Sequence, residues 1–267
     1  MRSIWWFLLL AYTIACGKDD PNIHKGPYVH VLDSGDVEVG WLTAVDANSD
    51  VVYGVTRNYG SSVTKDDLTR DHSLVIKGLR IGQVYHFEVS SAGAVRKGQF
   101  VAGLKFDKGP YSQNVRNSKA AVMWEINLPV DGMIEYGPLD SAGLDTLNLA
   151  GEKGFREIEL SGLEPGTMYG YGAVAGGVSS RVGLFRTPSP SDTAFTFLLY
   201  GDSRDNPSGH RELARRMSRE GAAFTLHSGD FLKDGREQHR WNPEFVLPAR
   251  SLLLAGPIYP YSRQSGA

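Results

Sequence analysis

Two stretches decide the fold of the last third of the chain: FLLYGDSR at residues 197–204 and TLHSGD at residues 225–230. Each is an apolar run that ends at Gly-Asp, and the charged segment between them has helical spacing. A strand, a helix and a second strand predict parallel strands whose carboxyl ends meet at one sheet edge. Asp202 and Asp230 would then lie side by side there. Adjacent carboxylates are ligands for hard or borderline cations, so the pair predicts a metal site.

The residues around these stretches predict one right-handed βαβ unit. The apolar runs 194–200 and 222–226 are typical of strands that are covered on both faces. Between them, Asn206-Pro207-Ser208 is expected to supply a turn and the N-cap of a helix, whose apolar spacing runs over 211–220. A polar segment with two prolines, 186–192, predicts a linker ahead of the unit.

The middle of the chain repeats once at a nearly constant offset. Alternating apolar and polar residues, with glycines and frequent turn signals, predict strands throughout this region. The repeat indicates a tandem duplication of a sandwich-sized unit. Its clearest matches are Gly26-Pro27-Tyr28 with Gly109-Pro110-Tyr111, Trp41 with Trp124, and Tyr85 with Tyr169. The two tryptophans are expected to lie in the domain cores.

The second copy contains LEPGTMY at residues 163–169, which resembles the tyrosine corner of fibronectin type III sandwiches. In that motif a tyrosine hydroxyl bonds to upstream backbone. Residues 79–85 are a looser version that lacks the proline. The predicted fold is therefore multidomain, with two tandem all-β, fibronectin type III-like sandwiches at 26–103 and 107–187 ahead of the α/β segment.

The N-terminus predicts export. Arg2 precedes an apolar run, 4–12, that is too short to span a bilayer and typical of a signal-peptide core. The run leads to Thr-Ile-Ala before Cys16, which resembles the bacterial lipobox. Residues 1–16 are thus expected to be a lipoprotein signal peptide, with lipid attached to Cys16, and 17–25 a linker. The alternative for the cysteine is a buried thiol.

Composition narrows the possible partners. The chain has 28 Lys and Arg against 30 Asp and Glu, so its charge gives no indication of nucleic-acid binding. Its single cysteine leaves no disulfide framework. The lipobox resemblance implies a membrane anchor on an exported protein, located at the bacterial outer membrane or cell surface, or in the periplasm.

The sequence around both Gly-Asp ends resembles calcineurin-like metallophosphoesterases, in particular those with a purple-acid-phosphatase-type or fibronectin-type N-terminal module. The resemblance rests on YGDSR at 200–204, HSGD at 227–230 and the stretch from Trp241 to Pro260. It implies that 193–267 form the N-terminal, incomplete part of an α/β phosphoesterase domain. It also implies two Fe, Mn or Zn ions, one bound by Asp202 and both bridged by Asp230, which activate a water to attack a phosphate ester.

Three features depart from this family pattern. Many relatives carry histidine where this chain has Arg204, and purple acid phosphatases carry tyrosine where it has Lys233. Arg204 is therefore interpreted either as a contact to substrate phosphate or as a surface arginine. His227, which is not one of these departures, is interpreted as a hydrogen-bonded residue behind the metal ligands. The family's later ligand blocks do not occur in 261–267, for which a frameshift or a truncated reading is one hypothesis.

The sequence is compatible with two functions. The first is an exported, lipid-anchored, metal-dependent phosphoesterase, which as given is expected to have little or no activity because the later ligand motifs are missing. The second is a non-enzymatic surface lipoprotein whose sandwiches bind a partner or a glycan. Bound metal would favour the first function over the second.

Overall fold

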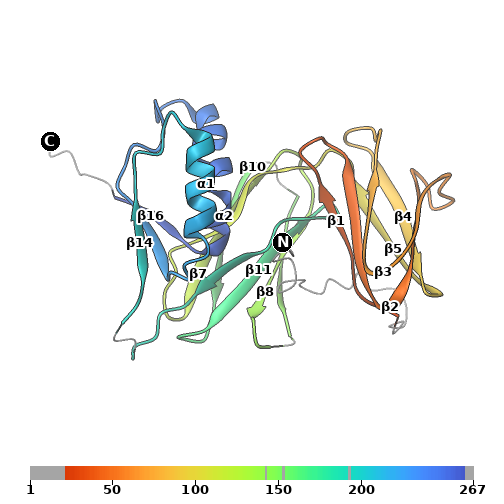
Figure 1. Cartoon of the computed structure of the whole chain (residues 1–267), viewed down its shortest axis with the longest axis horizontal. Coiled ribbons are helices and arrows are strands. Elements are labelled where there is room, and N and C mark those ends of the chain that lie inside the picture. Colours follow the sequence, from red (N-terminus) through yellow and green to blue (C-terminus); the bar gives the residue numbers. More distant parts are fainter. Residues whose placement is uncertain (1–21, 142, 152–153, 192–193, 262–267) are drawn as a thin grey trace.

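The computed structural model describes residues 22–141, 143–151, 154–191 and 194–261, so Cys16 lies outside the described residues. Three parts follow one another along the chain (Figure 1). The first two are β-sandwiches, and the third combines a short parallel sheet with helices. The second sandwich lies between the other two parts, with the helices at one end of the molecule.

Five strands build the first sandwich. The long strand β2 belongs to both of its layers, because its first half pairs with β1 and its second half with β4. Register shifts in its pairing with β3, between Leu42 and Ser49, mark the point where it passes from one layer to the other. The strands are β1 (Ile23–Val31), β2 (Val37–Gly54), β3 (Ser61–Ile76), β4 (Val84–Ser91) and β5 (Ala94–Val101).

The second sandwich has the same arrangement with its long strands divided. One sheet has the order β10-β7-β6, and the other has the order β12-β11-β8-β9, with β13 also paired to β11. The strands are β6 (Phe106–Gln113), β7 (Lys119–Ile126), β8 (Gly132–Pro138), β9 (Asp145–Leu149), β10 (Gly154–Ser161), β11 (Met168–Ala175), β12 (Val178–Ser179) and β13 (Gly183–Arg186).

The repeat seen in the sequence is present in three dimensions. Trp41 and Trp124 are both buried, with 1% and 2% of their surface exposed, as expected for core residues. The hydroxyl of Tyr85 accepts a hydrogen bond from the backbone N–H five residues earlier at 3.2 Å, and that of Tyr169 does the same at 2.8 Å. The predicted tyrosine corner is confirmed in the second copy and is also present in the first.

The third part is a parallel sheet of order β14-β15-β16 with two helices. Helix α1 connects β14 to β15, and the segment after β15 leads through η2 and η3 into α2 and then β16. The bounds are β14 (Phe197–Tyr200), α1 (Pro207–Met217), β15 (Phe224–His227), η2 (Gln238–Arg240), η3 (Trp241–Val246), α2 (Leu247–Ala255) and β16 (Ile258–Pro260).

Helix α1 differs from the predicted range, 211–220. It begins at Pro207, because the Asn206 side chain accepts a hydrogen bond from the Gly209 N–H at 2.9 Å and proline suits the first helical position. It ends at Met217, before Gly221. The predicted cap within 206–208 is confirmed and is Asn206, and the helix begins before the stretch in which its apolar spacing is found.

The prediction that β14 is covered on both faces is wrong. Phe197 and Leu199 leave 47% and 64% of their surface exposed, whereas Tyr200 is buried. Successive side chains of a strand point to opposite faces, and α1 and α2 share one core with Tyr200. Both helices therefore cover the same face of the sheet (Figure 1). Phe195, Phe197 and Phe224 form an aromatic group with centroids 5.6 to 6.4 Å apart on the other face.

The third part packs against the second sandwich. The Gln113 side chain donates a hydrogen bond to the carbonyl of Ile258 at 3.0 Å, and the Val115 N–H donates to the Tyr259 hydroxyl at 3.2 Å. Tyr111, in β6, also packs against the core of the helical part. Strand β16 is thus fixed to the sandwich. In the described ranges, no helix combines the length and the hydropathy that a membrane span requires.

Candidate metal-binding edge

Asp202 lies two residues after β14 and Asp230 three residues after β15, so both follow the carboxyl ends of paired parallel strands. Both have a positive φ, 52° and 58°, a conformation that aspartate tolerates better than most residues. The Asp202 N–H donates to the carbonyl of Gly229 at 3.0 Å, and the N–H groups of Ser203 and Arg204 donate to the carbonyl of Asp230 at 3.1 and 3.2 Å. These bonds tie the two loops together and place both carboxylates at one edge of the sheet.

The two carboxylates converge on the guanidinium group of Arg204. Its Nε lies 3.6 Å from Asp202 Oδ1, and its Nη2 lies 3.3 Å from Asp230 Oδ2. The side chains are solvent-exposed, with 42% of Arg204, 79% of Asp202 and 55% of Asp230 accessible. Ion pairs this exposed contribute at most about 1 kcal/mol each to stability. The arrangement therefore leaves the carboxylates open to another cation.

His227 ends β15 beneath this edge and is fully buried. Its Nδ1 accepts a hydrogen bond from the Gly229 N–H at 3.2 Å, so Nε2 carries the proton and donates to Ser203 Oγ at 3.0 Å. Burial, followed by the proximity of His210, lowers the pKa of His227 to about 4, which keeps the ring neutral. Both ring nitrogens are occupied by these loops. His227 thus supports the residues that carry the aspartates and does not face a cation between them.

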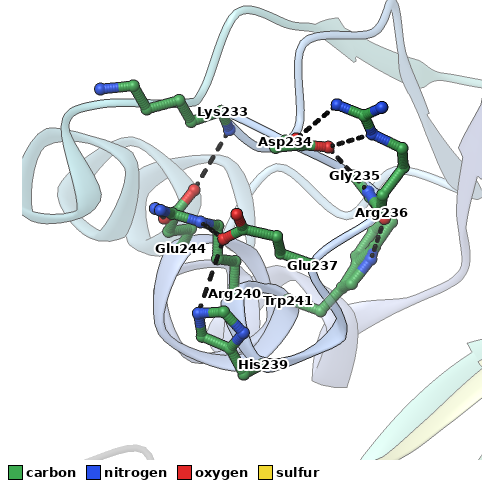
Figure 2. A network of polar contacts seen from close by, with 9 residues as sticks. All are labelled: Lys233, Asp234, Gly235, Arg236, Glu237, His239, Arg240, Trp241 and Glu244. Carbon is green, nitrogen blue, oxygen red and sulfur yellow. Dashed lines mark hydrogen bonds and ion pairs between the residues drawn. The ribbon is translucent and has the colours of Figure 1, made fainter.

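The segment that follows Asp230 is held by a network of polar contacts (Figure 2). The Lys233 N–H donates to Glu244 Oε2 at 3.2 Å, and Arg240 pairs with Glu244 at 2.7 Å and also with Glu237. The indole of Trp241 donates to the carbonyl of Gly235 at 3.4 Å. Lys233 therefore contributes its backbone to the network, and its side chain lies in solvent, away from the contacts drawn.

The fit of this edge to metal is partial. Asp202 and Asp230 suit a cation, because their carboxylates already converge on one positive group. Within the described residues, however, no group of three or more His, Cys, Asp or Glu side chains is placed to hold a metal ion. The described residues fit two ligands of one ion. They do not fit the complete ligand set of the metal pair that the family resemblance implies.

The structure brings together three of the residues selected from the sequence, namely Asp202, Asp230 and Arg204, and places His227 behind them. Ser203 was not selected. It is 8% exposed and is the side chain through which His227 contacts the Asp202 loop. Its only sequence signal is its position next to the aspartate, since strand periodicity does not extend into the loop.

Comparison with known proteins leaves the family open. No family model matches the chain, and no curated protein matches it. Among solved structures, "Structure of PhoD" is 15% identical with a TM-score of 0.48 and covers 58% of this chain. The purple acid phosphatase PPD1 from yellow lupin (Lupinus luteus) seeds is 13% identical with a TM-score of 0.49 and covers 88% of this chain. A two-domain fibronectin type III segment of chicken tenascin is 16% identical with a TM-score of 0.27 and covers 61%.

These similarities are too distant to decide what the chain does. The chain spans 38% of the length of the PhoD structure and 54% of that of the lupin enzyme. It spans 95% of the tenascin segment. The residues at the sheet edge are therefore the better indication of function.

Proposed function

We propose that the carboxyl edge of β14 and β15 is part of the site of a metal-dependent phosphoesterase, with Asp202 and Asp230 as two of the metal ligands. One observation carries the proposal: two exposed carboxylates from separate strands converge on a single positive group. Ligand sites in open α/β sheets lie outside the carboxyl ends of the strands, which is where these side chains lie. The remaining ligands have to come from outside the described residues.

The chemistry of such a site follows from its charges. A bound metal ion polarises phosphate oxygens and makes hydroxide available near neutral pH. This chain's own residues contribute the carboxylates that hold the positive charge, while Ser203 and His227 fix the loop between them. Arg204 has a planar fork that can bind phosphate oxygens bidentately once it is released from the aspartates.

Metal binding by the 267-residue chain tests this proposal. Manganese(II) is titrated into the protein, and the free ion is followed by its electron paramagnetic resonance signal. We expect weak, saturable binding that disappears in the double variant Asp202→Asn/Asp230→Asn. Hydrolysis of p-nitrophenyl phosphate by the same chain is expected to stay at the level of the double variant, because the described residues supply only two ligands. Equal metal binding by the two proteins would contradict the proposal.

The second candidate is a non-enzymatic protein whose sandwich domains, proposed to be of fibronectin type III type, bind a partner or a glycan. The observation that favours it is the ion pairing of Arg204 with both aspartates, which gives the edge a structural explanation without metal. Absence of any saturable manganese binding would support this candidate. Binding that depends on the two carboxylates would exclude it as the explanation of the edge.

Export and lipid attachment are proposed from the sequence alone. A lipid on Cys16 would anchor the chain to a membrane and place the sheet edge outside the cytoplasm. Expression in a bacterial host, followed by membrane fractionation and mass spectrometry, tests this directly. We expect a diacylglyceryl mass on the N-terminal peptide and its loss in Cys16→Ala. Recovery of an unmodified chain with residues 1–16 intact would contradict it.

A further inference from the structure

A cavity of about 420 Å³ lies where the three parts of the chain meet. The end of β1, the connection into β6, the β12 turn, and η3 with α2 all contribute to its walls. Pockets of roughly 300 to 1,000 Å³ are typical of small-molecule sites, and such sites are common between domains. The cavity is separate from the sheet edge described above, because neither Asp202 nor Asp230 lines it.

Much of the lining is apolar and comes from all three parts of the chain. Side chains from the connection, from β12 and from the helical part surround the space, so an occupant would bury an apolar body there. The residues concerned include Leu104, Phe106, Val178, Val246, Leu253 and Leu254.

The most distinctive polar residue in the wall is Arg250 of α2. Its side chain is partly buried, and in the described part of the chain no carboxylate forms an ion pair with it. Loss of water lowers the pKa of its guanidinium, the positive charges of Arg181 and Arg211 lower it further, and Asp33 opposes the effect. A desolvated cation beside other cations is stabilised by an anion that enters the cavity.

The other charged groups of the wall have neighbours of their own. Lys108 forms an ion pair with Glu125 at 2.6 Å, and Glu38 accepts a hydrogen bond from Ser73. Lys105, Asp107, Asp33 and Arg181 also line the space. With Arg250 included, the wall carries four Lys and Arg side chains against three Asp and Glu side chains, so the preference for an anion rests on Arg250 itself.

We propose that this junction cavity binds a small organic anion with an apolar body, its acid group paired with Arg250. The acid can be a carboxylate or a phosphate, since both accept bidentate bonds from a guanidinium. Because residues from all three parts line the cavity, binding would also hold these parts together.

Calorimetric titration of the whole chain tests this, with phenylacetate and phenylphosphonate as the two probes. We expect one saturable site per chain for at least one of them, and the preferred probe identifies the acid. Arg250→Gln is expected to weaken binding about tenfold or more, as for a lost charge-assisted hydrogen bond. Arg216→Gln removes a charge from an exposed pair on α1, and with it affinity should stay unchanged.

A second variant distinguishes a loss of binding from a loss of folding. Leu254→Trp keeps every charge and fills part of the cavity, so it should abolish binding while the unfolding midpoint stays close to that of the unmodified chain. The proposal is overturned if neither probe binds saturably, or if either cavity variant binds as well as the Arg216 control.

Discussion

Replacing Arg204 by alanine separates a cation site from a purely structural ion-pair cluster. In the unmodified chain, a metal ion has to displace or approach the guanidinium that lies 3.6 and 3.3 Å from the two carboxylates. Arg204→Ala removes this competing charge and leaves both carboxylates in place. We therefore expect tighter metal binding and no gain in the stability of the metal-free chain.

The size of the effect follows from Coulomb's law. Two unit charges about 4 Å apart in water interact by about 1 kcal/mol, so relief of repulsion from a divalent ion contributes about 2 kcal/mol. Freeing the carboxylates from two exposed ion pairs, each contributing at most about 1 kcal/mol, adds up to about 2 kcal/mol. Together these terms predict manganese binding that is tighter by roughly 30- to 700-fold, at about 1.4 kcal/mol per factor of ten.

The assay is manganese titration at low ionic strength, where the contrast is largest. Arg236→Ala is the matched control, because it also removes one arginine from an exposed ion pair, that with Asp234. Its affinity should equal that of the unmodified chain within twofold. If Arg204→Ala binds manganese no more tightly than the Arg236 control, the carboxylates do not form a cation site and the reasoning fails.

Three further predictions concern the fold. Burial raises the pKa of Glu135 from 4.5 to about 7, so the folded chain loses stability as the pH rises between these two values. In urea unfolding, Glu135→Gln should therefore be more stable than the unmodified chain by up to about 3 kcal/mol at pH 8.5 and by little at pH 4.5. A gain in stability that does not depend on pH would contradict this. Tyr169→Phe should lose about 1–2 kcal/mol, because it leaves the Glu164 N–H without its 2.8 Å acceptor, and unchanged thermal unfolding would refute that. Phe197→Ser/Leu199→Ser should reduce the fluorescence of an apolar dye bound to the exposed sheet face, and undiminished fluorescence would show that the dye binds elsewhere.

Local sequence signals predicted the parts of the fold that depend on local chemistry. The tyrosine corner was predictable because one hydroxyl bonds to backbone five residues away, and a helix cap within 206–208 was predictable from its turn residues. The convergence of Asp202 and Asp230 followed from two strand ends with the same pattern, which parallel pairing brings to one edge.

Other features depend on contacts that no local pattern encodes. The exposed face of β14 could not be predicted, because a continuous apolar run does not show whether helices cover one face of the strand or both. The pairing of Arg204 with both aspartates depends on how two loops meet, and so does the bond between Ser203 and His227. The junction cavity was also beyond prediction, because its walls are separated by most of the chain.

The backbone at Asp202 and Asp230 offers a final distinction between structure and function. Both residues have a positive φ, which asparagine and glycine adopt readily and alanine does not. Asp202→Asn breaks the ion pair with Arg204 in either case, so it should lower stability by at most about 1 kcal/mol because the groups are exposed. If the carboxylates bind metal, Asp202→Asn should also lose manganese binding, while Asp202→Ala should lose binding and a further ~1 kcal/mol of stability through backbone strain. Urea unfolding and manganese titration of the two variants give the answer, and retained binding in Asp202→Asn would remove the carboxylate from the site.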